Sequence, residues 1–562
     1  MAKSKPIYTL DLETDPFTKD EMVYPFAAGF YDGVTFKSTW GADCIAQMCR
    51  HIEKMPPGLI YLHNGGRFDI FFFLDWLSGK AVIINGRIVK ARMQTKLGVH
   101  QVRDSYAIMP FPLARTGLKD EIDYEKMRRG VREKHKTEIL TYLKTDCTGL
   151  HELCTAFIDR FGPQLTVGAT AMRELKKVHS FERMNKQTDK ELRELYYYGG
   201  RVQCFKKGIL HGDFKVYDVN SMYPNAMKRF KHPLGKRLSS TQKIGKETFF
   251  VTAEGRNYGA FPSRGKDGGL RFDIEEGTFS VSIHEWKAAI ALGLFEPRKI
   301  IRCDNFARSG TFEDFVDQFY GARIQAAGFG DHILALFYKY VLNACYGKFA
   351  TNVTNFRDYT IEPDYKDLHR YLPDGKVDET WWVAHQINPT FRLIVWEKPT
   401  DDVMGWHNVA TAASITGAAR SVLMRGLYAS NEPIYCDTDS IICESMAGIE
   451  IDDTKLGAWK LEKTGNRAAI AGKKMYAIFS PVCPGCESTA SDIFDGKCRD
   501  EKTRNKWHSN GGCVKHANKG ARISPLEIEA AAMGEEILFE SIVPTLHWDG
   551  SHSWVKRRVR RT

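Results

Sequence analysis

Hydrophobic and polar residues alternate over the first 160 positions in a way that predicts a mixed α/β domain. Residues 7–12 form a strand-like run, and short apolar stretches then alternate with helix-like patterns down to about Arg160. The segment of residues 176–191 is polar and rich in charge. Such a composition is typical of a connection, so it predicts the first domain boundary.

The pattern beyond this boundary predicts a larger unit that mixes both kinds of element. Residues 215–219 read as a strand, and a mixed, Gly-rich region follows to about residue 301. Apolar spacing then predicts a helical pattern over residues 312–346 and a helix over residues 411–429, separated by a less regular, proline-containing region. A strand pair is expected around Asp437, because apolar residues flank it on both sides.

Composition places the chain among ordinary globular proteins. Apolar residues make up 43% and charged residues 27% of the 562 positions, which excludes a disordered chain, a collagen-like fibre and a coiled coil. No apolar run reaches the roughly 18 residues of a membrane span, and acidic residues interrupt the N-terminus before a signal peptide could form. The 13 cysteines favour reduced thiols over a disulfide framework. We therefore expect a soluble, intracellular protein of two or more domains.

An excess of positive charge permits a polyanionic partner. The 80 Lys and Arg against 69 Asp and Glu give a formal charge of +11. The C-terminus concentrates this charge in Lys556, Arg557, Arg558, Arg560 and Arg561. Such a segment is either a solvated tail or an arm that grips a nucleic-acid backbone by displacing counterions.

A first group of acidic residues lies in the N-terminal part of the chain. Asp11 and Glu13 share one face of the predicted strand, and Asp69 and Asp146 each lie in an apolar frame. Tyr142 stands one helical turn before Asp146. A lone Asp-x-Glu is usually mere surface, but four such acids suit a two-metal site that cleaves a phosphodiester.

The residues around Asp69 add aromatic rings to this group. Phe68 and Phe72 could hold a frayed base by stacking, with His63 and Asn64 just upstream. The alternative for these phenylalanines is an ordinary apolar core.

A second group of acidic residues lies in the C-terminal half. Asp218 ends a predicted strand at a turn, and Asp437 and Asp439 stand two apart near the tip of a predicted hairpin. Carboxylates between such apolar flanks are costly unless they hold a cation. The alternative, a plain surface hairpin, fits poorly because Ile441 and Ile442 follow at once.

A helical stripe between these acids suits a nucleoside triphosphate. Lys339, Asn343 and Tyr346 follow three- and four-residue steps, so they share one helical face. A cation there suits phosphates, and an aromatic ring suits a base or sugar. An amphipathic core helix with incidental polar residues remains the alternative.

Taken together, these residues resemble the family B DNA polymerases, and the matching motifs occur in the expected order along nearly the whole chain. The three exonuclease-like motifs are Asp11-x-Glu13, residues 64–69 and Tyr142-x-x-x-Asp146. The motifs similar to polymerase motifs A, B and C are Asp218-x-x-Ser221-Met222-Tyr223-Pro224, Lys339-x-x-x-Asn343-Ala344-x-Tyr346-Gly347 and Tyr435-x-Asp437-Thr438-Asp439. Three further motifs are Tyr197-Tyr198-Gly199-Gly200, Thr416-Gly417-Ala418-Ala419-Arg420 and Lys474-Met475-Tyr476.

The resemblance implies a multidomain fold of α/β and α+β parts. An RNase H-like 3′–5′ exonuclease domain would span residues 1–190, and a right-hand polymerase domain would span residues 191–562. The parts implied for the second domain are a palm (about 191–235 and 409–480), a first insertion (about 236–310), fingers (about 311–347), a second insertion (about 348–408), a Cys-containing insert (about 481–513) and a thumb (about 514–562).

The resemblance also assigns roles to residues. Two Mg²⁺ or Mn²⁺ ions per active site would be held by Asp11, Glu13, Asp69 and Asp146 in one site and by Asp218, Val219, Asp437 and Asp439 in the other. These carboxylates would be catalytic together with Lys119 and Tyr142. The residues implied in substrate binding are Tyr223, Arg323, Lys339, Asn343, Tyr346, Lys474 and Tyr476. The residues implied in DNA binding are Thr14, His63, Asn64, Phe68, Phe72, Ser105, Tyr198, Gly199, Gly200, Ser221, Thr416 and Arg420.

The short chain and the long intervals around motif B resemble the protein-primed phage branch of the family, and within it the tectivirus-like polymerases. This implies template-primer DNA, dNTPs and a separate terminal protein as partners, the last in a heterodimer with an otherwise monomeric enzyme. It implies DNA synthesis with 3′–5′ proofreading and strand displacement, in the cytoplasm of an infected host cell and without a membrane.

Two positions and one cysteine-containing segment depart from the pattern of that branch. Ala344 stands where relatives commonly have serine, and Tyr106 follows Ser105 where relatives often have leucine. The family pattern does not supply Cys483, Cys486, Cys498 and Cys513, which lie near His508 and His516. Cys483 and Cys486 form a Cys-x-x-Cys pair, so this segment either holds a structural zinc ion or is a loop of reduced cysteines.

Rival functions remain open. A family B repair polymerase primed by DNA would need no terminal protein, and a nuclease with an inert polymerase half would need no motifs A and C. A non-catalytic DNA-binding protein would suit the basic C-terminus, but it has no use for seven acids in two metal-site patterns.

Overall fold

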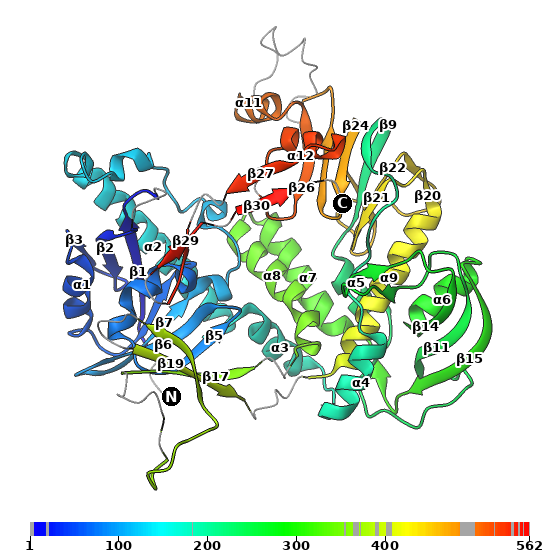
Figure 1. Cartoon of the computed structure of the whole chain (residues 1–562), viewed down its shortest axis with the longest axis horizontal. Helices are drawn as coiled ribbons and strands as arrows, with labels where there is room; N and C mark the ends of the chain where they lie inside the picture. Colours follow the sequence, from blue (N-terminus) through cyan, green and yellow to red (C-terminus); the bar gives the residue numbers. More distant parts are fainter. Residues whose placement is uncertain are drawn as a thin grey trace.

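A computed structural model describes most of the chain, in two lobes joined by a central layer of helices (Figure 1). The residues described are 5–17, 22–182, 184–352, 356–363, 370, 372–387, 393–400, 407–483, 501–521, 523–540, 544–548, 551–554 and 556–560. No helix in these ranges is both long and apolar enough to cross a membrane.

The first lobe is built on a ten-stranded sheet of order β18-β19-β17-β5-β6-β7-β4-β1-β2-β3. Its first seven strands are β1 (Ile7–Thr14), β2 (Pro25–Tyr31), β3 (Phe36–Trp40), β4 (Leu59–Leu62), β5 (Gly79–Ile84), β6 (Arg87–Thr95) and β7 (Gly98–Asp104). The pairs β1–β4 and β4–β7 are parallel, and β1–β2, β2–β3, β5–β6 and β6–β7 are antiparallel. The predicted strand at residues 7–12 is confirmed as β1.

Two helices cover opposite faces of β1. Leu10 and Leu12 pack with α1 (Cys44–Ile52) in one core cluster. Thr9, on the other face, donates a hydrogen bond of 2.8 Å to the carbonyl of Cys147 in α2 (Lys136–Phe161). The alternation of side chains along β1 therefore turns Asp11 and Glu13 toward the α2 side.

The last three strands of this sheet come from the predicted second insertion. They are β17 (Arg357–Pro363), β18 (Trp382–Ile387) and β19 (Leu393–Pro399), and β17 pairs with β5. Ile361 and Val395 join the same core cluster as Leu10. The expectation of irregular structure is wrong for these strands, because their edge pairing comes from residues almost 300 positions away.

The central layer consists of α3 (Val167–Val178), α7 (Glu313–Gly328) and α8 (His332–Phe349). The helical pattern over residues 312–346 is thus a helix pair, broken at Gly330, which has a positive φ of 77°. Phe157 and Phe161 of α2 share a core with these helices. The predicted boundary at residues 176–191 includes the start of α4 (Lys186–Tyr196), and packing is continuous across it.

The second lobe contains a seven-stranded sheet of order β26-β25-β24-β9-β22-β21-β8 with antiparallel pairs throughout. Its strands are β8 (Val202–Cys204), β9 (Gly208–Val219), β21 (Tyr435–Asp437), β22 (Ser440–Cys443), β24 (Trp459–Gly472), β25 (Met475–Phe479) and β26 (Cys513–Asn518). Two helices, α5 (Met222–Arg229) and α9 (Val409–Ala429), belong to this region. The strand pair expected around Asp437 is confirmed, whereas β26 joins this sheet from within the predicted thumb.

The region predicted as the first insertion forms a three-stranded sheet of β11 (Thr248–Asn257), β14 (Glu276–Ser282) and β15 (Phe295–Asn305). Helix α6 (Ile283–Ala291) follows β14 directly. Its N-terminus is a capping box in which the side chain of Ser282 accepts from the Glu285 amide, and Glu285 accepts from the Ser282 amide in return.

The C-terminal region contains α11 (Glu501–Ser509), α12 (Pro525–Met533), β27 (Ile537–Glu540) and β30 (Lys556–Val559). The basic C-terminus is not simply a solvated tail, because β30 pairs with β27 and Arg558 lies 3.7 Å from a carboxylate oxygen of Glu536. Trp548 packs against Phe71 of the first lobe at 5.0 Å between ring centroids.

Short elements complete the described structure. The minor strands are β10 (His232–Pro233), β12 (Ser263–Arg264), β13 (Leu270–Arg271), β16 (Ser309–Gly310), β20 (Ser430–Asn431), β23 (Ser445–Met446), β28 (Thr545–Leu546) and β29 (His552–Ser553). The 3-10 helices are η1 (Gly65–Arg67), η2 (Asp69–Trp76), η3 (Ser105–Ala107), η4 (Leu113–Thr116), η5 (Tyr124–Met127) and η6 (Arg132–His135).

Candidate active sites

The four acids predicted near the N-terminus come together beside β1. Burial raises the pKa of Asp11 well above its usual range, and the negative charges of Asp69 and Asp146 raise it further. Burial raises the pKa of Glu13 in the same direction, and Asp11 and Asp146 add to it. Burial is the largest of the causes that raise the pKa of Asp69 to about 7. Four carboxylates that disfavour one another's charge form a site that needs cations.

Lys119 supplies one such cation. Its Nζ lies 2.9 Å from Oδ2 of Asp146, and its charge lowers the pKa of Asp11 and Glu13 against the effect of burial. The other oxygen of Asp146, Oδ1, is buried without a hydrogen-bond partner. A buried, orphaned carboxylate oxygen beside three further carboxylates fits a hard divalent cation. Among the described residues, however, no three Asp, Glu, His or Cys side chains are arranged closely enough to bind a metal ion together.

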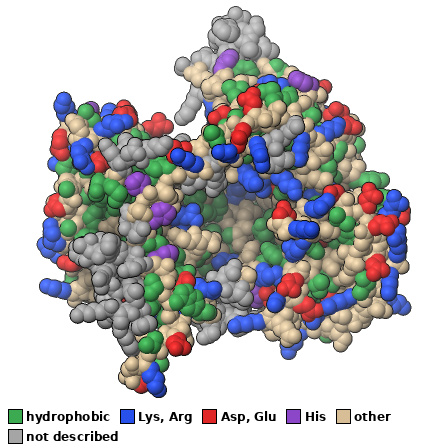
Figure 2. Space-filling view, in the orientation of Figure 1, with side chains coloured by type: hydrophobic (Ala, Val, Ile, Leu, Met, Phe, Trp, Pro, Cys, Tyr) green, Lys and Arg blue, Asp and Glu red, His purple; other side chains and the backbone are tan. Residues whose placement is uncertain are grey.

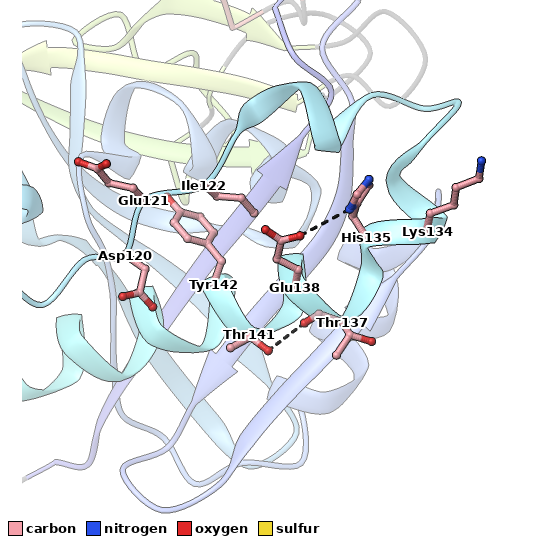
Figure 3. Close-up of a pocket in the computed structure, with 9 residues that line it drawn as sticks. All are labelled: Asp120, Glu121, Ile122, Lys134, His135, Thr137, Glu138, Thr141 and Tyr142. Carbon is pink, nitrogen blue, oxygen red and sulfur yellow. Dashed lines mark hydrogen bonds and ion pairs between the residues drawn. The ribbon is translucent and has the colours of Figure 1, made fainter.

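Tyr142 lies at the edge of this site, on the same face of α2 as Asp146. Its ring is 5.2 Å from the Lys119 ammonium. Figure 3 shows Tyr142 at one end of an open cavity of about 610 Å³, between α2 and the segment that carries Asp120 and Glu121. The same cavity is closed at its other end by His135 and Glu138, 3.5 Å apart. Tyr142 is therefore the residue that this cavity shares with the carboxylate site.

The predicted DNA-binding residues of the first lobe divide into exposed and buried ones. Phe68 is half-buried and lies edge-on to Phe72 at 5.4 Å, and Asn64 is exposed at a positive φ of 59°. In contrast, Ser105 is fully buried and donates to the Leu62 carbonyl at 3.1 Å. Its hydroxyl also lies 3.0 Å from Nδ1 of His63. Ser105 therefore positions His63 and offers no exposed hydroxyl of its own, whereas Thr14 at the end of β1 is half-buried.

The acids predicted in the C-terminal half converge where β9 and β21 end and β22 begins. Asp218 pairs with Ser440 in the register of β9 and β22, and the Val219 amide donates to the Asp439 carbonyl at 2.8 Å. The turn between β21 and β22 places Thr438 at φ 58°, which is unusual for a β-branched residue. Strained backbone at such a turn is typical of a functional site.

The charges in this second site resemble those in the first. Burial and, after it, the nearby charge of Asp439 raise the pKa of Asp218 to about 7. Burial and Asp437 raise the pKa of Asp439 to about 6. Sequence reasoning missed two further residues, Glu462 and Lys515, which form an ion pair and act on the pKa of both aspartates. Glu462 lies on β24 and Lys515 on β26, and only the pairing of the sheet places these strands beside the site. No local sequence motif could have predicted the two residues.

Asp437 is compensated by the predicted primer-site lysine. Lys474 Nζ lies 3.0 Å and 2.9 Å from the two carboxylate oxygens of Asp437. The Lys474 amide donates to the hydroxyl of Tyr435, whose ring lies 4.8 Å from that of Tyr476. Asp437 is thus held by a cation, which leaves Asp218 and Asp439 as the acids without a bonded cation.

The predicted triphosphate residues on α7 and α8 face these acids. Arg323 donates to the hydroxyl of Ser221 at 3.4 Å, and its charge lowers the pKa of Lys339 in addition to burial. Asn343 donates to the Lys339 carbonyl at 2.9 Å and so stays on the same helical face.

The two tyrosines predicted to bind the nucleotide, Tyr223 and Tyr346, stack on each other. The ring of Tyr223, from α5, stacks on that of Tyr346, from α8, with 3.8 Å between centroids and 14° between planes. This stack joins the predicted palm to the predicted fingers, and it lies near Asp439, whose charge acts on the pKa of both phenols.

The segment of residues 197–200 is positioned by a buried arginine. Arg420 donates to the carbonyls of Tyr198 and Gly199 at 2.7 and 2.8 Å, and it is only 4% exposed. Thr416 is 2% exposed, and its hydroxyl donates to the Ala413 carbonyl within α9. Both were predicted to bind DNA, but their side chains are buried, and Arg420 reaches the segment of residues 197–200 only by holding its carbonyls.

Glycine is required at residue 200. A Cβ atom there would lie 2.5 Å from the hydroxyl oxygen of Thr438, inside contact distance. Gly200 therefore allows the segment of residues 197–200 to touch the turn that carries Asp437 and Asp439.

The proposed zinc ligands fall only partly within the described residues. Cys486 and Cys498 lie outside them. Sγ of Cys513 lies 3.9 Å from Nδ1 of His516, and Cys483 is buried next to Trp507. The zinc hypothesis stays a prediction.

Between the two lobes, the molecular surface is hollowed, and Lys and Arg side chains gather along the rim of the hollow (Figure 2). Over 523 residues, the chain is 44% identical to the DNA-directed DNA polymerase of Enterobacteria phage PRD1, a match that covers 93% of this chain and 86% of that protein. The chain belongs to the phage-type family B DNA polymerases.

Two further findings agree with this membership. Residues 114–380 match the family model for DNA polymerase type B, organellar and viral. The DNA polymerase of Bacillus phage phi29 is 24% identical over 539 residues, covering 84% of this chain and 86% of that one. The prediction of a phage-type polymerase near those of tectiviruses is thereby confirmed, and this polymerase carries out DNA-directed DNA synthesis.

The fold of this polymerase is also found among solved structures. Phi29 DNA polymerase in its ternary complex with primer-template DNA and incoming nucleotide substrates matches with a TM-score of 0.73 at 20% identity, over 99% of this chain and 100% of that one. The predicted fold class, an exonuclease-like domain followed by a right-hand polymerase domain, is thus confirmed.

Proposed function

We propose that this polymerase starts DNA chains on a terminal protein, extends them from the DNA 3′-OH, and removes mismatched 3′ ends in a separate exonuclease site. The observation that carries the proposal is the presence of two clusters of buried or half-buried carboxylates with raised pKa, one beside β1 and one where β9 meets β22. A single-activity enzyme needs only one of them.

The second cluster would be the polymerase site. Divalent ions held there by Asp218, Asp439 and the main chain of Val219 would lower the pKa of the attacking hydroxyl and offset the charge of the departing pyrophosphate. Lys339 and Arg323 would bind the triphosphate, because the charge of Lys339 acts on Asp218 and Arg323 lies close to Lys339 and bonds Ser221. Lys474 would orient Asp437 and lie beside the primer terminus.

Tyr223 would select the sugar of the incoming nucleotide. Its ring is fixed by the stack on Tyr346, so it presents a rigid wall that a 2′-hydroxyl would meet. Replacing Tyr223 with Val should raise the incorporation of ribonucleotides relative to deoxyribonucleotides. An unchanged ratio would remove this role.

The first cluster would be the exonuclease site. Lys119 would hold Asp146 ionised, and Tyr142 would orient the attacking water at the mouth of the cavity. The double variant Asp11→Ala/Glu13→Ala should lose 3′–5′ degradation of single-stranded DNA and keep primer extension. Loss of both activities in a folded protein would show that the two clusters are not separate sites.

Protein priming is the finer part of the proposal. The test is a labelled-dNTP assay on the natural genome end, with and without the candidate terminal protein. A nucleotide linked covalently to that protein, and absent with Asp439→Ala, is the expected result. Extension of DNA primers without any protein adduct would favour the alternative, a DNA-primed repair polymerase. We place the reaction in the cytoplasm of an infected host cell.

A further inference from the structure

A small basic cavity lies on the sheet of the first lobe, away from the carboxylates of both sites. Its volume is about 260 Å³, and its lining residues are Lys5, Lys80, Lys90, Arg92, Val99 and Gln101. We call these four cations the sheet patch. None of the roles assigned above uses them.

The strand register explains why these cations share one face. Lys90 pairs with Arg103, and Arg92 pairs with Gln101, across β6 and β7. Residues two apart on a strand point the same way, so Lys90 and Arg92 form a row with about 7 Å between their Cα atoms. Lys80 stands on β5, next to β6 in the sheet, and Lys5 precedes β1.

The positive charge of this face is not compensated. Within the described residues, no carboxylate forms an ion pair with any cation of the sheet patch. Arg103 beside it is buried, and it donates only to neutral acceptors, namely Gln101, the Tyr61 hydroxyl and the Pro163 carbonyl. On the adjoining strand β17, Glu362 lies 3.0 Å from Arg370.

Burial and the positive charges of this face lower the pKa of Lys90. Burial lowers the pKa of Lys90, and the charges of Arg103, Lys80 and Arg92 lower it further. A side chain in this position gains from any bound anion. Because the cations lie in a row along an extended strand, the anion that fits best is itself extended and carries charges at regular intervals.

We propose that the sheet patch binds the phosphodiester backbone of a single-stranded DNA segment outside the two catalytic sites. The proposal rests on the proposed function, since it extends the DNA path of the same enzyme. The patch lies toward the start of β1, and Asp11 and Glu13 lie toward its end, on the same face of the sheet.

The test is the salt dependence of single-stranded DNA binding. Binding of a fluorescent oligonucleotide is measured in EDTA, which prevents degradation, over a range of salt concentrations. If Lys90 and Arg92 each neutralise one phosphate, Lys90→Gln/Arg92→Gln should make the slope of log K against log salt shallower by about 1.4, at roughly 0.7 per phosphate. Lys37→Gln/Lys54→Gln removes the same charge from exposed residues on β3 and after α1, and should leave the slope unchanged.

A second measurement needs no variant. Lys80 and Lys90 should be acetylated more slowly by a soluble reagent when single-stranded DNA is bound, whereas Lys37 and Lys54 should react at the same rate. Equal slopes for both double variants, or no protection of Lys80 and Lys90, would overturn the proposal. A fall in affinity for the terminal protein with an unchanged DNA slope would reassign the patch to that protein.

The outcome is distinct from a failure of the proposed function. The Lys90→Gln/Arg92→Gln variant should extend a short primed template at the wild-type rate, because neither residue contacts a carboxylate cluster. If wild-type protein extends the primer but the two slopes agree, only the sheet patch is refuted. If wild-type protein extends nothing, the proposed function fails first.

Discussion

Replacing Arg420 with Met should destabilise the contact between α6 and α9 by about 3–5 kcal/mol, the usual cost of leaving a buried charge without its partner. Arg420 donates to the two carboxylate oxygens of Glu285 at 2.7 and 2.9 Å. Glu285 is fully buried. Its carboxylate therefore has no water to replace the lost guanidinium.

The geometry leaves little room for a smaller effect. Besides the two bonds to Glu285, Arg420 supplies the bonds to the carbonyls of Tyr198 and Gly199. Near the same pair, a Cβ atom at Gly417 would lie 2.2 Å from the Ser282 hydroxyl, so α9 and the N-terminus of α6 are in close contact around the buried pair. Methionine keeps the packing volume of the stem but provides none of the four hydrogen bonds.

Amide hydrogen exchange followed by mass spectrometry measures this locally. Peptides from α6 and α9 should exchange faster in Arg420→Met, with an opening free energy lower by the stated amount. Arg420→Met/Glu285→Met removes both charges and should recover much of the loss. Arg298→Met breaks an ion pair of the same insertion sheet that lies in solvent, and it should leave exchange in α6 unchanged. A change of less than about 1 kcal/mol in Arg420→Met would refute the reasoning.

Three further predictions concern the carboxylate clusters. Lys119→Met removes the cation beside Asp146, so the carboxylate pKa values rise and the pH profile of exonuclease activity shifts upward while polymerase activity keeps its profile. Glu462→Gln removes a negative charge that raises the pKa of Asp218 and Asp439, so the rising limb of the polymerase pH profile should move to lower pH. The folded pKa values of Asp218 and Asp439, about 7 and about 6, exceed those of the unfolded chain. The folded state therefore binds more protons from about pH 4 to 7 and loses stability as pH rises. The rise in Tm caused by Mg²⁺ should therefore be larger at pH 8 than at pH 5 in a thermal melt, and equal rises would contradict this account.

Sequence reasoning succeeded where chemistry and geometry are both local. Asp437 and Asp439 stand two residues apart at a hairpin, so strand alternation and a tight turn suffice to place them together. Asp11 and Glu13 share a face of one strand for the same reason. The helix at residues 411–429 could be predicted because its apolar pattern extends over many turns.

The failures concern pairings that no local pattern encodes. The strand β17 pairs with β5, and the strand β26, which carries Lys515, pairs with β25 across a gap of more than thirty residues in the sequence. Arg420 shows a different limit. The motif indicated that Arg420 is important, but only the fold shows that it forms an ion pair with Glu285 of α6.

The carboxylate cluster of Asp218 and Asp439 lowers the stability of the fold. Asp218 and Asp439 keep raised pKa values, and the backbone near them takes positive φ at Ser221 and Thr438. Strain and repulsion of this kind persist only where the surrounding structure imposes them. The imposing contacts are identifiable: Arg323 bonds Ser221, and the Arg201 carbonyl accepts from the Thr438 amide. Arg323 lies on α7 (Glu313–Gly328), so in the polymerase site proposed above a movement of α7 would alter the bond that holds the turn at Ser221, three residues after Asp218.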